Sequence, residues 1–181
     1  ENISKSTNEK QLITSNIIAN LCACYFILSK PDEFTLCVYR GINLLYGNGI
    51  DNESVSIISW YSTLLTHQKK HIESNKVADM TIKLIDKIPQ SNQISSSLNV
   101  LSCLVKFCHQ PYEETIKLHK KAYYIGMRRG EIARSIISLG NIILLLFSKG
   151  DPLPHIYEKA DEYQQQANNK SLFVPVIDNI K

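Results

Sequence analysis

The sequence predicts an all-α fold in which antiparallel helical hairpins stack side by side. Three observations support this fold class. Apolar residues recur every three or four positions along most of the 181 residues, and no segment alternates as a half-buried strand does. Short groups rich in Gly, Pro, Asn and Asp separate the apolar runs, as they do at helix ends. Connections this short place consecutive helices next to each other and antiparallel.

Composition and charge fit a soluble globular protein with a hydrophobic core. Hydrophobic residues make up 44% of the chain and charged residues 20%, which is ordinary for such proteins. The formal net charge of +3 is too small to predict nucleic-acid binding without a concentrated basic patch. No membrane segment is expected, because Asn16 and Asn20 interrupt the apolar run 12–28 and the run 142–147 is too short to span a bilayer.

The first helix is predicted to open the first half of the array, residues 6–88. Ser6 or Thr7 caps it, and Lys30-Pro31 ends it near residue 28. Five side chains fit one stripe of this helix and are expected to pack against the rest of the array: Ile13, Ile17, Leu21, Cys24 and Leu28.

Three further helices complete the first half. The second ends at the Gly-Asn-Gly turn 47–49, and Asp51 or Asn52 caps the third. Residues 67–74 are polar and are expected to connect the third helix to the fourth. Pro89 ends the fourth helix.

The second half of the array, residues 91–181, is predicted to begin with a fifth helix capped by Ser91-Asn92. Pro111 opens the sixth helix, and Arg128-Arg129-Gly130 closes it with cations and a left-handed Gly cap. The inward positions of this sixth helix are expected to be Tyr112, Ile116, His119, Tyr123 and Gly126 or Met127.

The seventh helix, residues 131–148, is apolar almost all round, so it must be covered on more than one side. Asp151-Pro152 starts the eighth helix, and a short helix interrupted at Pro175 is expected within 170–181. The inward side of the eighth helix carries Ile156, Ala160, Tyr163 and Ala167. Periodicity therefore predicts about eight or nine helices in a single helical-repeat domain, 1–181.

The five cysteines are expected to be buried free thiols in a reducing compartment. Their number is odd and no CxxC pair occurs. They are Cys22, Cys24, Cys37, Cys103 and Cys108.

The hairpins are expected to follow a tetratricopeptide-like pattern. The hairpin period is near the roughly 34 residues of those repeats. Leu139-Gly140 matches the Leu-Gly of a first repeat helix, and Gly150-Asp151 matches the turn before the second helix.

Several segments between Cys37 and Gln166 resemble the helical region of large multi-sensor signalling kinases. Cys108 departs from that pattern, since the family has a tryptophan near this position. The resembling residues are Leu45 with Gly47-Asn48; the segment 54–61; Phe107, His109, Pro111, Ala122, Tyr123, Gly126, Gly130 and Ala133; and Gly150-Asp151-Pro152-Leu153 with Tyr163.

The resemblance implies a signalling context. In these kinases a serine/threonine-kinase-like domain and a STAND-type ATPase domain precede the tetratricopeptide-like region, and a GAF domain and a histidine kinase follow it. The resemblance implies no catalytic residue for this segment. The chain begins with Glu1, which favours a segment of a longer protein.

No catalytic residue, metal ligand or cofactor site is predicted. His67 and His71 do not form a metalloprotease pair, because Gln68 follows the first His in place of Glu and Lys69-Lys70 lie between the two histidines. The turn 47–49 lacks the Lys and Ser/Thr of a phosphate-binding loop. Cys108-His109 are adjacent in sequence, and this does not make a nucleophile–base pair. His119 is expected to be a core histidine.

The candidate partner-binding residues form a basic, aromatic cluster on the sixth helix. Such a cluster suits an acidic protein surface, while RNA binding or a solvated helix face are alternatives. Neighbouring Glu113, Glu114 and Glu131 partly neutralise it. The candidates are Lys117, Lys120, Lys121, Tyr124, Arg128 and Arg129.

We therefore expect a non-catalytic, cytoplasmic regulatory or scaffold segment of a multi-domain signalling histidine kinase. Its partners would be the neighbouring kinase, ATPase or GAF domains or another signalling protein. The sequence also leaves a homo-oligomer as an alternative. One alternative is a stand-alone module that binds an acidic peptide or protein. The other is an all-α enzyme with dispersed catalytic residues.

Overall fold

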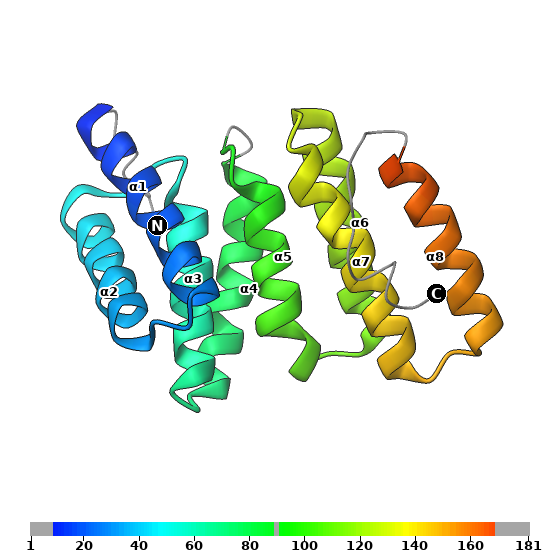
Figure 1. Ribbon diagram of the computed structural model, residues 1–181. Coiled ribbons are helices and arrows are strands. Elements are labelled where there is room, and N and C mark those ends of the chain that lie inside the picture. Colours follow the sequence, from blue (N-terminus) through cyan, green and yellow to red (C-terminus); the bar gives the residue numbers. More distant parts are fainter. Residues whose placement is uncertain (1–8, 89–90, 169–181) are drawn as a thin grey trace.

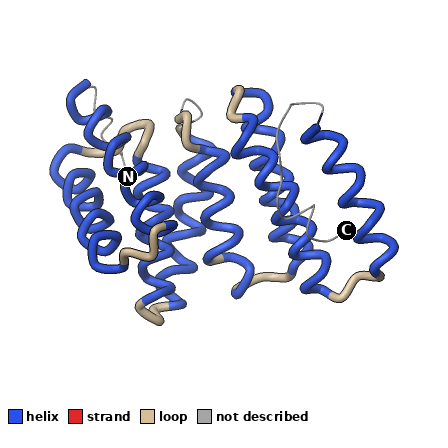
Figure 2. The backbone as a smooth tube through the Cα atoms, viewed as in Figure 1, coloured by secondary structure: helices blue, strands red, loops and turns tan. Residues whose placement is uncertain are grey.

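A computed structural model describes residues 9–88 and 91–168. Within these ranges the chain forms eight α-helices and a one-turn 3-10 helix, and it contains no strand (Figure 2). The all-α prediction is confirmed. The helices are α1 (Glu9–Ile27), α2 (Pro31–Asn48), α3 (Ser54–His67), α4 (His71–Lys87), α5 (Ile94–Leu104), α6 (Tyr112–Arg129), α7 (Ile132–Lys149) and α8 (Leu153–Asn168), and the 3-10 helix is Lys106–Cys108.

The helices form an elongated row with α1 and α2 at one end and α8 at the other (Figure 1). Consecutive helices pack against each other, and α1, α3, α5 and α7 also contact one another in sequence. Helices α2, α4, α6 and α8 begin at residues 31, 71, 112 and 153, so the repeat spacing is 40 or 41 residues. This spacing is longer than the predicted one of roughly 34 residues and nearer to that of HEAT and armadillo repeats.

The core runs along the row as a series of apolar clusters between neighbouring helices. At the C-terminal end, Ile142 and Ile143 of α7 pack against α8. The predicted inward side of α8 is confirmed, since all four of its side chains are buried: Ile156, Ala160, Tyr163 and Ala167.

Helix α7 is covered on several sides, as its composition predicts, by α5, α6 and α8. One stripe nevertheless remains exposed, at Ile137, Leu144 and Phe147. By length and composition α7 is the one helix in the described ranges that could cross a membrane, and half of it is buried within the protein.

The predicted packing face of α1 is wrong. Ile13 is 56% exposed, Ile17 53%, Leu21 39% and Leu28 65%. The opposite face is buried instead, through Gln11, Ser15, Ala19 and Cys22. Two of these inward residues are polar and are held by hydrogen bonds, because Gln11 Nε2 donates to the Gly49 carbonyl and Ser15 Oγ donates to Asp51.

Several helix boundaries also differ from prediction. Helix α4 begins at His71, so most of the predicted polar connection 67–74 is helical. The predicted cap at Ser6 or Thr7 and the short helix within 170–181 lie outside the described residues.

Helix α6 ends as predicted. Its last residues are Arg128-Arg129, and Gly130 follows with a positive φ of 77°. Of the six positions expected to face inward, His119 and Gly126 are buried, and Tyr112, Ile116, Tyr123 and Met127 are half-buried.

At Gly126, α6 approaches its neighbours closely. A Cβ at this position would overlap Ser135 Oγ of α7 and would lie 2.7 Å from Ser95 Oγ of α5. The absence of a side chain therefore lets α5, α6 and α7 pack closely.

Candidate functional site: a basic cleft between α4, α5 and α6

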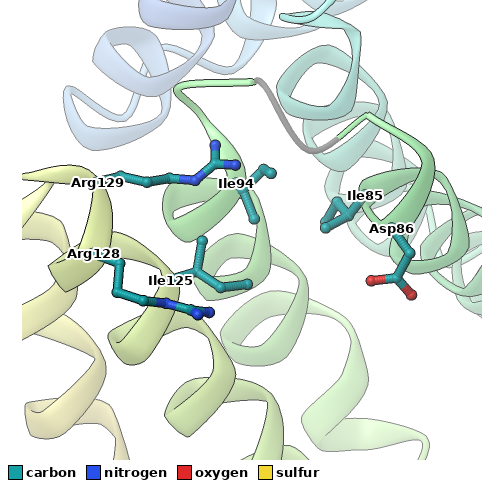
Figure 3. Close-up of a pocket in the computed structure, with 6 residues that line it drawn as sticks. All are labelled: Ile85, Asp86, Ile94, Ile125, Arg128 and Arg129. Carbon is teal, nitrogen blue, oxygen red and sulfur yellow. The ribbon is translucent and has the colours of Figure 1, made fainter.

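A cleft opens where α4 leaves α5. Their contact is the sparsest between consecutive helices, whereas α6 packs closely on both α5 and α7. The resulting cavity has a volume of about 440 Å³. Its walls are Ile85 and Asp86 from α4, Ile94 from α5, and Ile125, Arg128 and Arg129 from α6 (Figure 3).

The two arginines give the cleft its positive charge. In Figure 3 both side chains extend from the end of α6 across the cleft, toward the side where Ile85 and Asp86 lie. The guanidinium of Arg129 donates a hydrogen bond to the Ser91 carbonyl in the turn between α4 and α5. Arg129 is therefore held in place, while the exposed Arg128 faces solvent at the cleft.

A salt bridge joins the two walls of the cleft. Lys121 Nζ lies 2.9 Å from Asp86 Oδ1, with 38% and 64% of the two side chains exposed. A pair this exposed stabilises the fold by no more than about 1 kcal/mol. Because it neutralises Asp86, the two arginines remain as the excess charge, and the site suits an anionic ligand with an apolar part for the isoleucines.

The structure brings only part of the predicted cluster to this cleft. Arg128 and Arg129 line it and Lys121 borders it. Lys117 pairs instead with Glu114 of its own helix at 2.7 Å. Tyr124, 62% exposed, packs edge-on against Tyr123.

Lys120 is also exposed. Four of the six candidates lie on one side of α6, since positions 117, 121, 124 and 128 follow the three-and-four spacing of a helix face. The apolar residues Ile85, Ile94 and Ile125 were not among the candidates. These three isoleucines come together only because of the distance between α4 and α6, and no local sequence pattern predicts that distance.

A buried polar network ties α5, α6 and α7 together. His119 of α6 lies at its centre and is fully buried. Its Nδ1 is 3.0 Å from Asn99 Oδ1, and its Nε2 is 3.6 Å from Cys103 Sγ. Asn99 also accepts a hydrogen bond from Ser138 Oγ and donates one to the Arg134 carbonyl.

This network places a thiol, an imidazole and an amide in the order of a nucleophile, a base and an orienting group. Burial raises the pKa of Cys103 to about 12 and lowers the pKa of His119 to about 4. The thiol and the imidazole therefore both stay neutral at pH 7, and no thiolate forms for nucleophilic attack. His119 is a core histidine, as the sequence predicts.

Two acidic side chains lie in the turns that precede α3 and α7. Glu53 follows α2 and Glu131 follows α6, and burial is the main cause that raises the pKa of each. Arg134 opposes both shifts. It also donates to Gln93 Oε1 at 2.8 Å, so it links neighbouring turns.

Other candidates for chemistry are dispersed. Within the described ranges, no group of three or more His, Cys, Asp or Glu side chains is arranged to hold a metal ion. His67 and His71 lie at the end of α3 and the start of α4, and both are exposed. The five cysteines are free, with Cys22 and Cys37 buried, Cys103 half-buried, and Cys24 and Cys108 exposed.

The fold and the cleft define an all-α protein whose consecutive helices pack against each other, with a basic cleft that has an apolar floor. No known family model matches the chain, and no curated protein matches it in sequence.

Proposed function

We propose that the chain is a non-catalytic scaffold segment of a cytoplasmic, multi-domain signalling kinase, which holds other domains or a partner protein in a defined arrangement. One observation supports this above the others. The cleft is lined by α4 from one hairpin and by α5 and α6 from the next. An occupant therefore contacts two hairpins and favours one packing of them over others.

The resemblance to multi-sensor kinases supplies the context. We take support for a role without catalysis from the burial of His119 and Cys103, because burial favours the neutral form of both groups.

Three observations test this proposal. The full reading frame should encode ATPase and GAF sequences beside this segment, and those domains, purified, should bind the chain in a titration. Purified chain should not turn over ATP. ATP turnover that a point substitution within the chain abolishes would refute the scaffold proposal.

A second candidate function is a stand-alone module that captures an acidic peptide. The excess charge of Arg128 and Arg129 beside three isoleucines favours it. An acidic side chain would pair with Arg128, and a neighbouring apolar side chain would occupy the floor made by Ile85, Ile94 and Ile125.

A peptide library that alternates Glu or Asp with Leu or Phe is a direct probe. Arg128→Ala should weaken peptide binding by about ten-fold, the effect of one lost charge-assisted contact of roughly 1.4 kcal/mol. Lys117→Ala, on the same helix but away from the cleft, is the matched control and should bind as the unaltered chain does. Equal binding by both variants would exclude the cleft as the peptide site.

A further inference from the structure

The N-terminal helix carries an apolar face that nothing in the described residues covers. Helices α3, α5 and α7 each have packed neighbours on both sides along the row, whereas the substantial contacts of α1 with other described helices are those with α2 and α3. The face opposite those contacts is exposed. It consists of Ile13, Ile17, Asn20, Leu21, Cys24, Ile27 and Leu28.

This face has the spacing of a helix-pairing seam. Positions 13, 17, 20, 24 and 27 are separated alternately by four and three residues, as in the seam of two helices that pack side by side. No charged residue occurs from Gln11 to Ser29. Four of the exposed side chains are large aliphatics at least 50% exposed, which is unusual for a surface that faces only water: Ile13, Ile17, Ile27 and Leu28.

The face is also nearly symmetric about its own centre. If a second α1 lies antiparallel to the first, with the two-fold axis between residues 20 and 21, Ile13 meets Leu28 and Ile17 meets Cys24. Asn20 then meets Leu21 at the centre. Two of these pairs are apolar, Ile13 with Leu28 and Ile17 with Cys24, and each occurs twice across the axis, as in an isologous interface.

We propose that the chain forms a symmetric dimer through this face of α1, with a second copy as the occupant. The two apolar pairs that a second copy would make, and the lack of charge on this face, favour a second copy over a partner that binds through charged side chains. At the centre, Asn20 lies next to the axis. A polar residue at one seam position fixes the alignment of the helices at some cost in stability. The dimer is independent of the basic cleft, because α1 does not contribute to that site.

Light scattering and sedimentation across a dilution series test the proposal. The chain should have twice its monomer mass of 20.6 kDa at high concentration and dissociate on dilution. I17E should raise the dissociation constant by at least about ten-fold, because it places an unpaired charge in the seam. I72E is the matched control, since Ile72 of α4 is 70% exposed and lies away from α1 contacts. A monomer at every concentration would overturn the proposal.

Cross-linking tests the alignment itself. In a C108S background, which removes the other exposed thiol, I17C should form an intermolecular disulfide with Cys24 under mild oxidation. I17C with C24S should not. Circular dichroism should show the same helix content in all variants. A dimer that forms equally well with I17E, or a cross-link that survives C24S, would place the interface elsewhere and refute this one.

Discussion

The buried His119 should make stability depend on pH in a defined direction. Its pKa is lowered from 6.5 to about 4 because the ring is desolvated among α5, α6 and α7. Below pH 6.5, His119 binds a proton in the unfolded chain but stays neutral in the folded chain. The contribution of this residue to stability is therefore complete above pH 6.5 and is lost as the pH falls toward 4.

The size of the effect follows from the two pKa values. The full difference corresponds to about 3 kcal/mol, at roughly 1.4 kcal/mol per pKa unit. Between pH 7 and pH 5 the loss should be about 2 kcal/mol. Glu53 and Glu131 act in the opposite sense, since their raised pKa values favour proton uptake by the folded state as the pH falls.

Urea unfolding of the unaltered chain and of His119→Gln, each at pH 7 and pH 5, separates these contributions. The Gln variant keeps a donor and an acceptor near Asn99 but cannot titrate. At pH 7 its unfolding free energy should be lower than that of the unaltered chain by about 1–3 kcal/mol, which measures the contribution of the hydrogen-bond network around His119. The difference in unfolding free energy between the two proteins should shrink by about 2 kcal/mol at pH 5. A difference that is the same at both pH values would refute the assignment of a depressed histidine.

Two further pairs of substitutions test the packing. Gly126→Ala should lower the unfolding free energy by about 1–3 kcal/mol, because the new methyl group displaces Ser135 Oγ; Gly47→Ala, with no neighbouring atom within 4 Å, should raise it by up to about 1 kcal/mol. Urea midpoints distinguish the two, and equal shifts would contradict the close approach. Asp51→Ala should cost about 1–3 kcal/mol, since Ser15 Oγ loses its acceptor at 2.6 Å. Asp51→Asn keeps an acceptor and should lose less, and the reverse order in thermal melts would count against this hydrogen bond.

Local signals in the sequence predict the helices well. Pro31 opens α2, and Pro111 immediately precedes α6. Gly130 and Gly150 both adopt a positive φ where their helices end. These features depend on the backbone preferences of single residues, so they can be inferred without knowledge of the neighbours.

The inward face of α1 could not be inferred in the same way. Periodicity finds an apolar stripe but does not show what lies beside it. The buried side instead carries Gln11 and Ser15, whose partners are the Gly49 carbonyl and Asp51, 38 and 36 residues away. Hydrogen bonds over such distances leave no local pattern, and they explain why the polar side packs inward.

The candidate site shows the same division. The sequence identifies the basic side of α6, because its cations follow helical spacing. It does not identify Ile85 and Ile94, which join Arg128 only because α4 and α5 diverge. A cleft formed by the separation of two helices is a property of the assembled array.

The sparse junction between α4 and α5 has a mechanical consequence. In a linear array each hairpin is restrained mainly by its neighbours, so the least restrained junction bends first under load. Because α3 still packs on α5, tension between the two ends of the chain would open the α4 side of this junction before the α3 side. A small rotation at this junction would displace the α1 end by a distance that increases with its separation from the junction.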